Sequence, residues 1–181
     1  MLAAMLALAM AGPLHKGESS VAIFAGRPFY SLRLDHGLSD RFDVGAGLDV
    51  SASGFLRPLL RSRLRIWSNE SARVSLRAAV AWAIPALKTR GFGPRPIAST
   101  GDGELGINLD LLVARRLWAF AELSALGQTD GKIEHSATFA QVLGGLEWAT
   151  EGPLSLLGRV GAIQGSRGRA LIGSVGAAWH F

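Results

Sequence analysis

Cysteine is absent from this chain of 181 residues, so it can form no disulfide and offers no thiolate to a metal or a catalytic site. Long apolar runs are absent too, although 49% of the residues are hydrophobic and the mean hydropathy is positive. A helix that spans a membrane needs about 20 consecutive apolar residues, whereas the best run beyond the N-terminus, residues 78–87, is interrupted by Pro85. Strands with one apolar and one polar face produce this combination.

The first residues, MLAAMLALAMAGP, form an apolar stretch that is too short to span a membrane. Ala9-Met10-Ala11 fits the A-x-A cleavage pattern, so residues 1–11 are predicted to be a signal peptide and residues 12–181 a single domain. A basic region before the apolar stretch is missing, which points to a displaced start codon or an atypical signal. A buried N-terminal helix is the alternative.

Alternation with a period of two dominates the rest of the chain, most clearly in RFDVGAGLDVSAS, residues 41–53. Similar segments are residues 15–25, 29–38, 58–67, 72–84, 104–114, 117–127, 136–149, 154–164 and 169–181. Short turns and longer loops connect them in alternation. This pattern predicts an all-β fold, an antiparallel up-and-down transmembrane β-barrel of ten strands. An eight-stranded barrel and a soluble β-sandwich are the alternatives.

The last eight residues, SVGAAWHF, carry a resemblance to a known class of proteins. They resemble the C-terminal signal of Gram-negative outer-membrane β-barrels. Every defined position of that signal is occupied, by Ser174, Gly176, Trp179 and Phe181. The resemblance implies a location in the bacterial outer membrane and recognition by the barrel-assembly machinery. It extends over residues 15–181 as a pattern rather than as identity.

Within such a barrel, charged residues on the polar face of each strand point into the lumen. The cations predicted there are Arg33, Arg61, Arg63, Arg65, Arg73, Arg77 and Arg159. The anions are Asp35, Asp43, Asp49, Glu104, Asp110, Glu122 and Glu147. Because buried charges require compensation, these groups are predicted to pair and to fill a narrow barrel. The alternative is a transverse field that guides small ions.

The outer loops carry an excess of positive charge, consistent with the net charge of +5. The residues concerned are Arg57, Lys88, Arg90, Arg95, Lys132, Arg167 and Arg169. Guanidinium groups bind phosphate groups through bidentate hydrogen bonds, so lipopolysaccharide or a protein partner is the predicted ligand of these residues. The alternative is that they are ordinary solvated loop charges. The longest loop, residues 85–103, is the predicted working surface. The arginines of RSRLRIW share one strand face, and a nucleic-acid partner is not predicted.

Some small outer-membrane barrels deacylate lipid A or cleave proteins, and they use histidine together with Ser, Glu or Asp. Of the four histidines, His135 alone is predicted on the outer side, beside Ser136 and on the strand of Glu147. Adjacent strand residues point to opposite faces, so His135 and Ser136 do not fit a nucleophile–base pair, and the deacylase motif has a residue between them. The sequence predicts neither a metal site nor a cofactor.

The resulting hypothesis is a non-enzymatic outer-membrane anchor or interaction protein, in contact with lipid and lipopolysaccharide and able to form part of a larger envelope assembly. A narrow channel for ions or small solutes is the first alternative. A hydrolase acting on lipid A is the second.

Overall fold

The computed structural model describes residues 14–27, 29–51, 55–85, 100–129, 137–165 and 168–181. Its strands are β1 (Ser19–Arg27), β2 (Phe29–Ser39), β3 (Phe42–Ser51), β4 (Phe55–Ser68), β5 (Ala72–Pro85), β6 (Thr100–Ala114), β7 (Leu117–Thr129), β8 (Ala137–Ala149), β9 (Leu154–Gly165) and β10 (Gly168–His180). Within these ranges no helix has the length and apolar character needed to cross a membrane.

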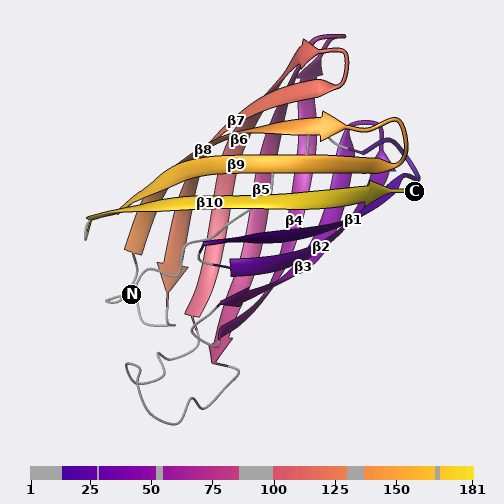
Figure 1. Ribbon diagram of the computed structural model, residues 1–181. Coiled ribbons are helices and arrows are strands. Elements are labelled where there is room, and N and C mark those ends of the chain that lie inside the picture. Colours follow the sequence, from indigo (N-terminus) through magenta and orange to yellow (C-terminus); the bar gives the residue numbers. More distant parts are fainter. Residues whose placement is uncertain (1–13, 28, 52–54, 86–99, 130–136, 166–167) are drawn as a thin grey trace.

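The strands form a closed barrel in which each one pairs antiparallel with its neighbours in sequence (Figure 1). β1 closes the cylinder against β10, with a register that runs from Ser20 opposite His180 to Arg27 opposite Gly173. The predicted ten-stranded, up-and-down architecture is therefore confirmed, and residues 29–38 form strand β2 rather than a separate segment.

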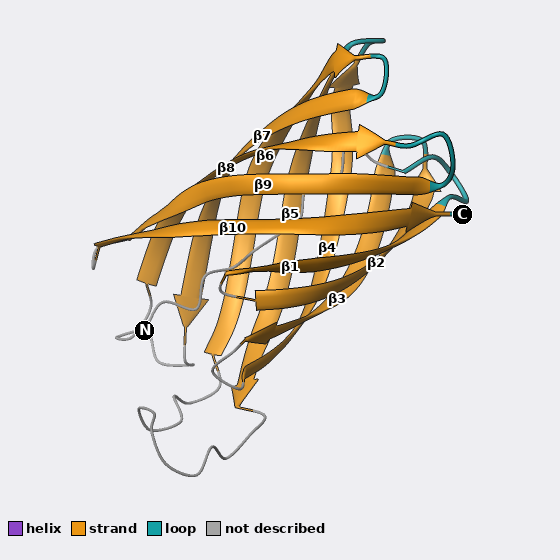
Figure 2. Ribbon diagram, viewed as in Figure 1, coloured by secondary structure: helices purple, strands orange, loops and turns teal. Residues whose placement is uncertain are grey.

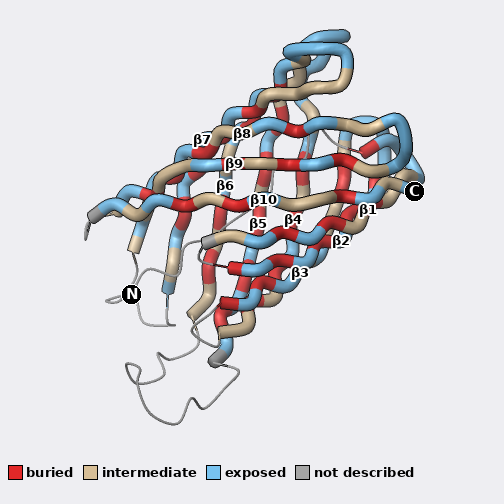
Figure 3. Tube along the Cα trace, in the orientation of Figure 1, coloured by how far each residue is buried: buried red, intermediate tan, exposed pale blue. Residues whose placement is uncertain are grey.

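Burial alternates along each strand, as Figure 3 shows. The outward positions carry large aliphatic side chains, with Ile23 61%, Val113 62% and Leu171 84% exposed. Polar side chains such as Arg33 and Asp49 are completely buried on the inward face. A soluble β-sandwich needs the opposite arrangement, whereas a lipid-facing barrel needs this one.

The described turns gather at the end of the barrel where the C-terminus lies, and we call this the short-turn end (Figure 2). Asn69 illustrates their construction, because its side-chain oxygen accepts hydrogen bonds from the backbone N–H groups of Ser71 and Ala72. We call the opposite end the long-loop end. In outer-membrane barrels the short turns face the periplasm.

Two strand boundaries differ from those predicted. β4 begins at Phe55 and β6 at Thr100, so both extend further toward the long-loop end than the alternation indicated. The predicted loop 85–103 is correspondingly shorter, because Pro85 belongs to β5 and residues 100–103 belong to β6. Both corrections add inward-facing positions to the lumen.

Four of the five tryptophans occupy the two rims of the apolar exterior. Trp67, Trp148 and Trp179 are exposed at the short-turn end, and Trp82 is exposed toward the other end. Strict alternation would turn Trp67 inward, but a bulge between Arg65 and Trp67 shifts the register and turns its side chain out. Aromatic side chains at both rims are typical of membrane interfaces.

Candidate functional site: the charged lumen

The structure places every charged residue predicted for the lumen on the inward face of its strand. Most are buried, while Arg65 and Arg73 are half-buried toward the short-turn end. Two charged residues that the sequence analysis did not assign to the lumen are buried there as well, Arg57 and Asp102. With them, the inward cations and anions of the described residues are equal in number.

Arg57 was predicted to lie in an outer loop, and the structure corrects this. It belongs to β4, is 2% exposed, and connects two carboxylates, with Nη1 2.7 Å from Asp49 Oδ2 and Nε 2.9 Å from Asp102 Oδ2. Asp49 also binds Arg33 at 2.5 Å and the hydroxyl of Ser31 at 2.7 Å. Both Arg57 and Asp102 could have been found by continuing the alternation beyond the predicted strands, because Arg57 lies directly before residues 58–67 and Asp102 lies two residues before 104–114.

At mid-depth, an ion pair crosses from β2 to β4 over the intervening strand. Arg61 binds both carboxylate oxygens of Asp35, with Nε 2.7 Å from Oδ1. The residue between them in register is Gly45, and a Cβ atom there would overlap Asp35 Oδ1. The glycine is therefore required for a salt bridge between strands that are not neighbours.

A second long ion pair joins Arg77 of β5 to Glu122 of β7, across β6. Gly106 of β6 stands opposite Arg77 of β5 and opposite Ser124 of β7. Because it has no side chain, it again leaves room for the ion pair on the inner face of the intervening strand. Glycine in the middle of a strand commonly marks such a close approach.

Near the short-turn end, Arg63 binds Asp43 through Nη2 at 2.8 Å and Nε at 3.1 Å. Asp43 accepts a further hydrogen bond from the backbone N–H of Leu14, whose side chain is buried. Arg73 lies 4.2 Å from the ring centre of Trp118, which fits the inward position of that tryptophan. The network thus extends along the barrel to this mouth.

The wall formed by β8–β10 and β1 is largely apolar on its inner face. Two clusters lie there: Phe29, Leu143, Ile163 and Ile172 with Phe139 in one, and Ala22, Phe24, Leu157 and Ala178 in the other. Arg57 of β4 lies over the ring of Phe29, the first residue of β2, at 5.9 Å from the ring centre, and Arg159 of β9 lies over Phe24 at 5.4 Å. Charged and apolar side chains therefore share the interior.

The segment before β1 folds against the short-turn end. Gly17, at a φ of +82°, donates to the carbonyl of Gly37, and Gly37 donates to the carbonyl of Glu18. The backbone N–H of Lys16 donates to Asp40 Oδ1 at 3.2 Å, and this bond holds the pKa of the exposed Asp40 carboxyl below its ordinary value of 3.8. We call residues 14–18 the N-terminal turn.

Comparisons by sequence found no relative, since no family model matches and none of the curated proteins is significantly similar. Solved structures do match. The KdgM porin in complex with disordered oligogalacturonate aligns at a TM-score of 0.57 and 7% identity, covering 91% of this chain and 99% of that one. A bacterial polysaccharide outer membrane secretin aligns at a TM-score of 0.54 and 13% identity, covering 87% of this chain but 57% of the secretin. The N-terminal β-barrel domain of Pseudomonas aeruginosa OprF aligns at 0.45 and 11% identity, over 93% and 100% of the two chains.

The chain has the fold of a bacterial outer-membrane β-barrel. The likeness is one of fold, and the apolar exterior of the barrel supplies the physical reason for a membrane location. Together they confirm the predicted location, the outer membrane.

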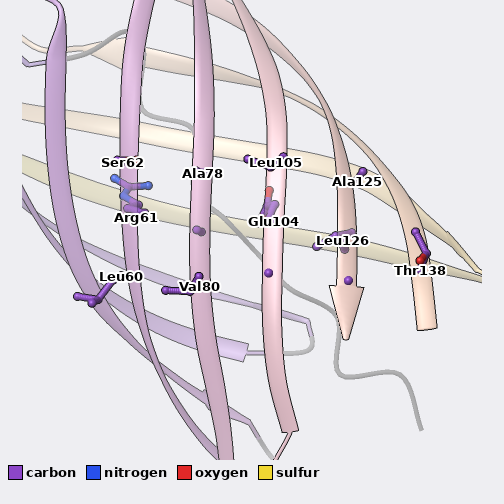
Figure 4. A pocket seen from close by; sticks show the side chains of 13 residues that line it. Leu60, Arg61, Ser62, Ala78, Val80, Glu104, Leu105, Ala125, Leu126 and Thr138 are labelled. Carbon is purple, nitrogen blue, oxygen red and sulfur yellow. The ribbon is translucent and has the colours of Figure 1, made fainter. Parts of the chain in front are cut away.

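On the lipid-facing side of the outer-membrane barrel, a shallow groove of about 630 Å³ crosses β4–β8 (Figure 4). Leu60, Val80 and Leu105 line it, with small residues such as Ala78 and Ala125 between them. Because the wall is a single sheet, the lumen residues Arg61 and Glu104 also border the groove. Its apolar lining suits contact with lipid hydrocarbon.

The remaining predicted site residues fall in different places. Trp179 and Phe181 of the C-terminal signal are exposed on the outer face, while Ser174 is buried and accepts a hydrogen bond from Arg159 Nε at 2.7 Å. Arg169 is exposed beside Gln164. The following lie outside the described residues: the predicted signal peptide 1–11, and Lys88, Arg90, Arg95, Lys132, His135, Ser136 and Arg167.

The sequence analysis missed the neutral polar residues of the lumen. Ser75, Asn108, Ser124 and Gln141 are each 3% exposed or less. The period-two pattern places all four on inward faces, so strand parity was a signal that could have found them. No group of histidines and carboxylates able to hold a metal occurs in the described ranges.

Proposed function

We propose that this outer-membrane barrel is a non-enzymatic membrane anchor or interaction protein with a closed lumen. The observation that carries the proposal is the filling of the interior. Ion pairs join Asp49, Arg57 and Asp102 near the long-loop end and Arg63 with Asp43 near the short-turn end. Apolar side chains occupy the opposite wall.

Conduction through such an interior requires a passing ion to separate buried pairs. A guanidinium–carboxylate pair in a low-dielectric site is held strongly, and removing one partner typically costs about 3–5 kcal/mol. Arg61 and Asp35, at 6% and 0% side-chain exposure, form such a pair at mid-depth. Small barrels are commonly filled by side chains in this way.

The partners we propose are the surrounding lipid, lipopolysaccharide and envelope proteins, with the barrel-assembly machinery during biogenesis. Exposed aromatic and aliphatic side chains at the rims, such as Trp179 and Phe181, support the contact with lipid. The cationic residues of the outer loops remain predicted contacts for phosphate groups. Of these, Arg169 is described and exposed.

A catalytic role is not part of the proposal. Ser19 Oγ lies 2.8 Å from His36 Nδ1 at the short-turn end, in a lipid-facing groove that Phe181 also lines. In the described part of the chain no carboxylate bonds to His36, so the pair lacks the third group that orients a general base in hydrolytic triads.

A narrow channel is the second candidate, and the segregation of charge favours it. The arginines concentrate on β4 and β5, while most of the carboxylates lie on the nearby strands β3, β6 and β7. Such an arrangement produces a field across the lumen that could guide an ion if the pairs opened.

Planar-bilayer recording distinguishes the two functions. We expect the purified, folded protein to insert without producing steady ohmic steps, and insertion is checked separately by flotation with liposomes. Regular steps whose size falls when Arg63 is replaced by Glu would contradict the closed lumen and support the channel. An Arg169→Glu variant, altered on the exposed rim, serves as the matched control.

A further inference from the structure

Buried polar atoms without a hydrogen-bond partner gather on one wall of the lumen. In the described residues they include both carboxylate oxygens of Glu104, Oε1 of Glu122 and Oδ1 of Asn108, with the hydroxyls of Ser75 and Ser124 and both amide atoms of Gln141. Every one of these side chains is at most 4% exposed. Because buried polar groups are nearly always hydrogen-bonded, the concentration of exceptions here requires an explanation.

The strand register brings these residues together around Gly106. Glu104 and Asn108 lie on either side of Gly106 on the same face of β6, while Ser124 stands opposite Gly106 and Gln141 stands opposite Ser124. Asn108 is in turn opposite Ser75 on β5 and Glu122 on β7. We call these six residues the Gly106 cluster; the glycine at its centre contributes no side chain of its own.

Acceptors outnumber donors in the Gly106 cluster. Five unpartnered oxygens belong to amide groups, which only accept through oxygen, or to carboxyl groups, which only accept while they are ionised, whereas the amide nitrogen of Gln141 is the single obligate donor. The two hydroxyls can serve either role. An occupant that supplies positive charge or several donors would satisfy the cluster.

The balance of charge in the cluster also favours a cation as the occupant. Glu122 binds Arg77 through Oε2, and Arg61 is bound to Asp35. Glu104 forms no salt bridge among the described residues; its carboxyl group lies beside the carboxyl group of Glu122 and the hydroxyl of Ser124, with Arg77 nearby. Glu104 and Glu122 thus share the single guanidinium group of Arg77, so the cluster holds one negative charge in excess whenever both carboxyl groups are ionised, and a bound cation would favour that ionised state.

We propose that the Gly106 cluster binds a single monovalent inorganic cation, Na⁺ or K⁺. Oxygen ligands from carboxylate, amide and hydroxyl groups are those that hard cations prefer. One unneutralised carboxylate matches one positive charge. A divalent ion would require more carboxylates, since Glu122 already carries Arg77. The cation would act as a structural component of the filled lumen, whether or not that lumen conducts.

Thermal stability in different salts tests the site. The folded barrel in detergent is heated in NaCl, KCl or N-methyl-D-glucamine chloride at equal ionic strength, so that general screening is the same. The temperature at which the compact gel band converts to the unfolded band is then measured. We expect Na⁺ or K⁺ to raise it by roughly 5 °C over the bulky organic cation, as a ligand at a large excess over its Kd does.

Variants locate the effect. Glu104→Gln removes the free charge at constant volume and is expected to abolish the difference between salts, and Ser124→Ala to reduce it. Glu147→Gln removes a lumen carboxylate on β8 outside the cluster and should retain the full difference. Equal conversion temperatures of the wild-type protein in all three salts would overturn the proposal, since water or a shared proton would then occupy the cluster. This wild-type comparison needs no variant to fold.

Discussion

Inside this barrel a large side chain repeatedly faces a glycine on the neighbouring strand. Three phenylalanines do so in exact register with their glycines: Phe24 with Gly176, Phe120 with Gly145 and Phe139 with Gly165. In each pair a Cβ on the glycine would overlap the ring. The inward glycines therefore provide the volume into which bulky side chains lean, and they are not interchangeable with alanine.

Replacing Gly176 by Ala is expected to lower the free energy of unfolding by about 1–3 kcal/mol, because the added methyl group overlaps Phe24 and the carbonyl of Ile23. Urea unfolding in detergent, followed by tryptophan fluorescence, measures the change. The control is Gly158→Ala, since nothing lies within 4 Å of a Cβ at Gly158. Its effect should stay within about 0.5 kcal/mol, and equal losses for both variants would contradict the packing argument.

At the scale of the strand, period-two alternation was enough to predict which face most of the strand residues occupy. It worked because a lipid-facing strand must separate apolar from polar side chains along its whole length. It failed at Trp67, where a bulge reverses the parity. It also missed the start of β4, so Arg57 was predicted to lie in a loop. A bulge depends on the pairing with the next strand, and no local sequence pattern records it.

The N-terminal turn is expected to loosen in acid. Because the bond from Lys16 lowers the pKa of Asp40, the ionised carboxylate stabilises the turn above pH 3.8, and this contribution is lost as the pH falls through the lower, folded pKa. Hydrogen exchange of the Lys16 amide, expressed as a protection factor, should fall over that range.

An Asp40→Ala variant should show low protection of Lys16 at every pH. The amide of Gly17 serves as an internal reference, since it donates to the backbone carbonyl of Gly37 at 2.8 Å rather than to a titrating group. Protection of Lys16 that is independent of pH in the unmodified protein would contradict the role assigned to Asp40.

At the scale of the whole molecule, the sequence predicted which charges share the interior but not which of them pair. Parity says only that Arg61 and Asp35 both face inward. Their contact spans three strands and depends on Gly45 between them, together with the closure and stagger of the cylinder. The gathering of unpartnered groups around Gly106 has the same origin, because it follows from register across four strands.

The stability of the barrel should depend on the network at its most connected point. Asp49→Asn leaves Arg33 and Arg57 without the carboxylate that they share, with an expected loss of about 3–5 kcal/mol. The compact band on an unboiled gel should convert at a lower temperature. Glu151→Gln breaks an exposed pair with Arg116 at 2.8 Å, and a change of about 1 kcal/mol or less is expected. Similar conversion temperatures for both variants would contradict a structural role for the network.

The ion pairs described in the lumen join strands within β2–β7 to one another. The seam between β1 and β10 instead places Ala22 against Ala178 and Phe24 against Gly176 on its inner face. These ion pairs therefore do not depend on the contact between β1 and β10 that closes the cylinder. Closure at this seam thus buries small and apolar side chains over most of its inner face, and the polar contact of His180 with Glu18 lies only at the short-turn end.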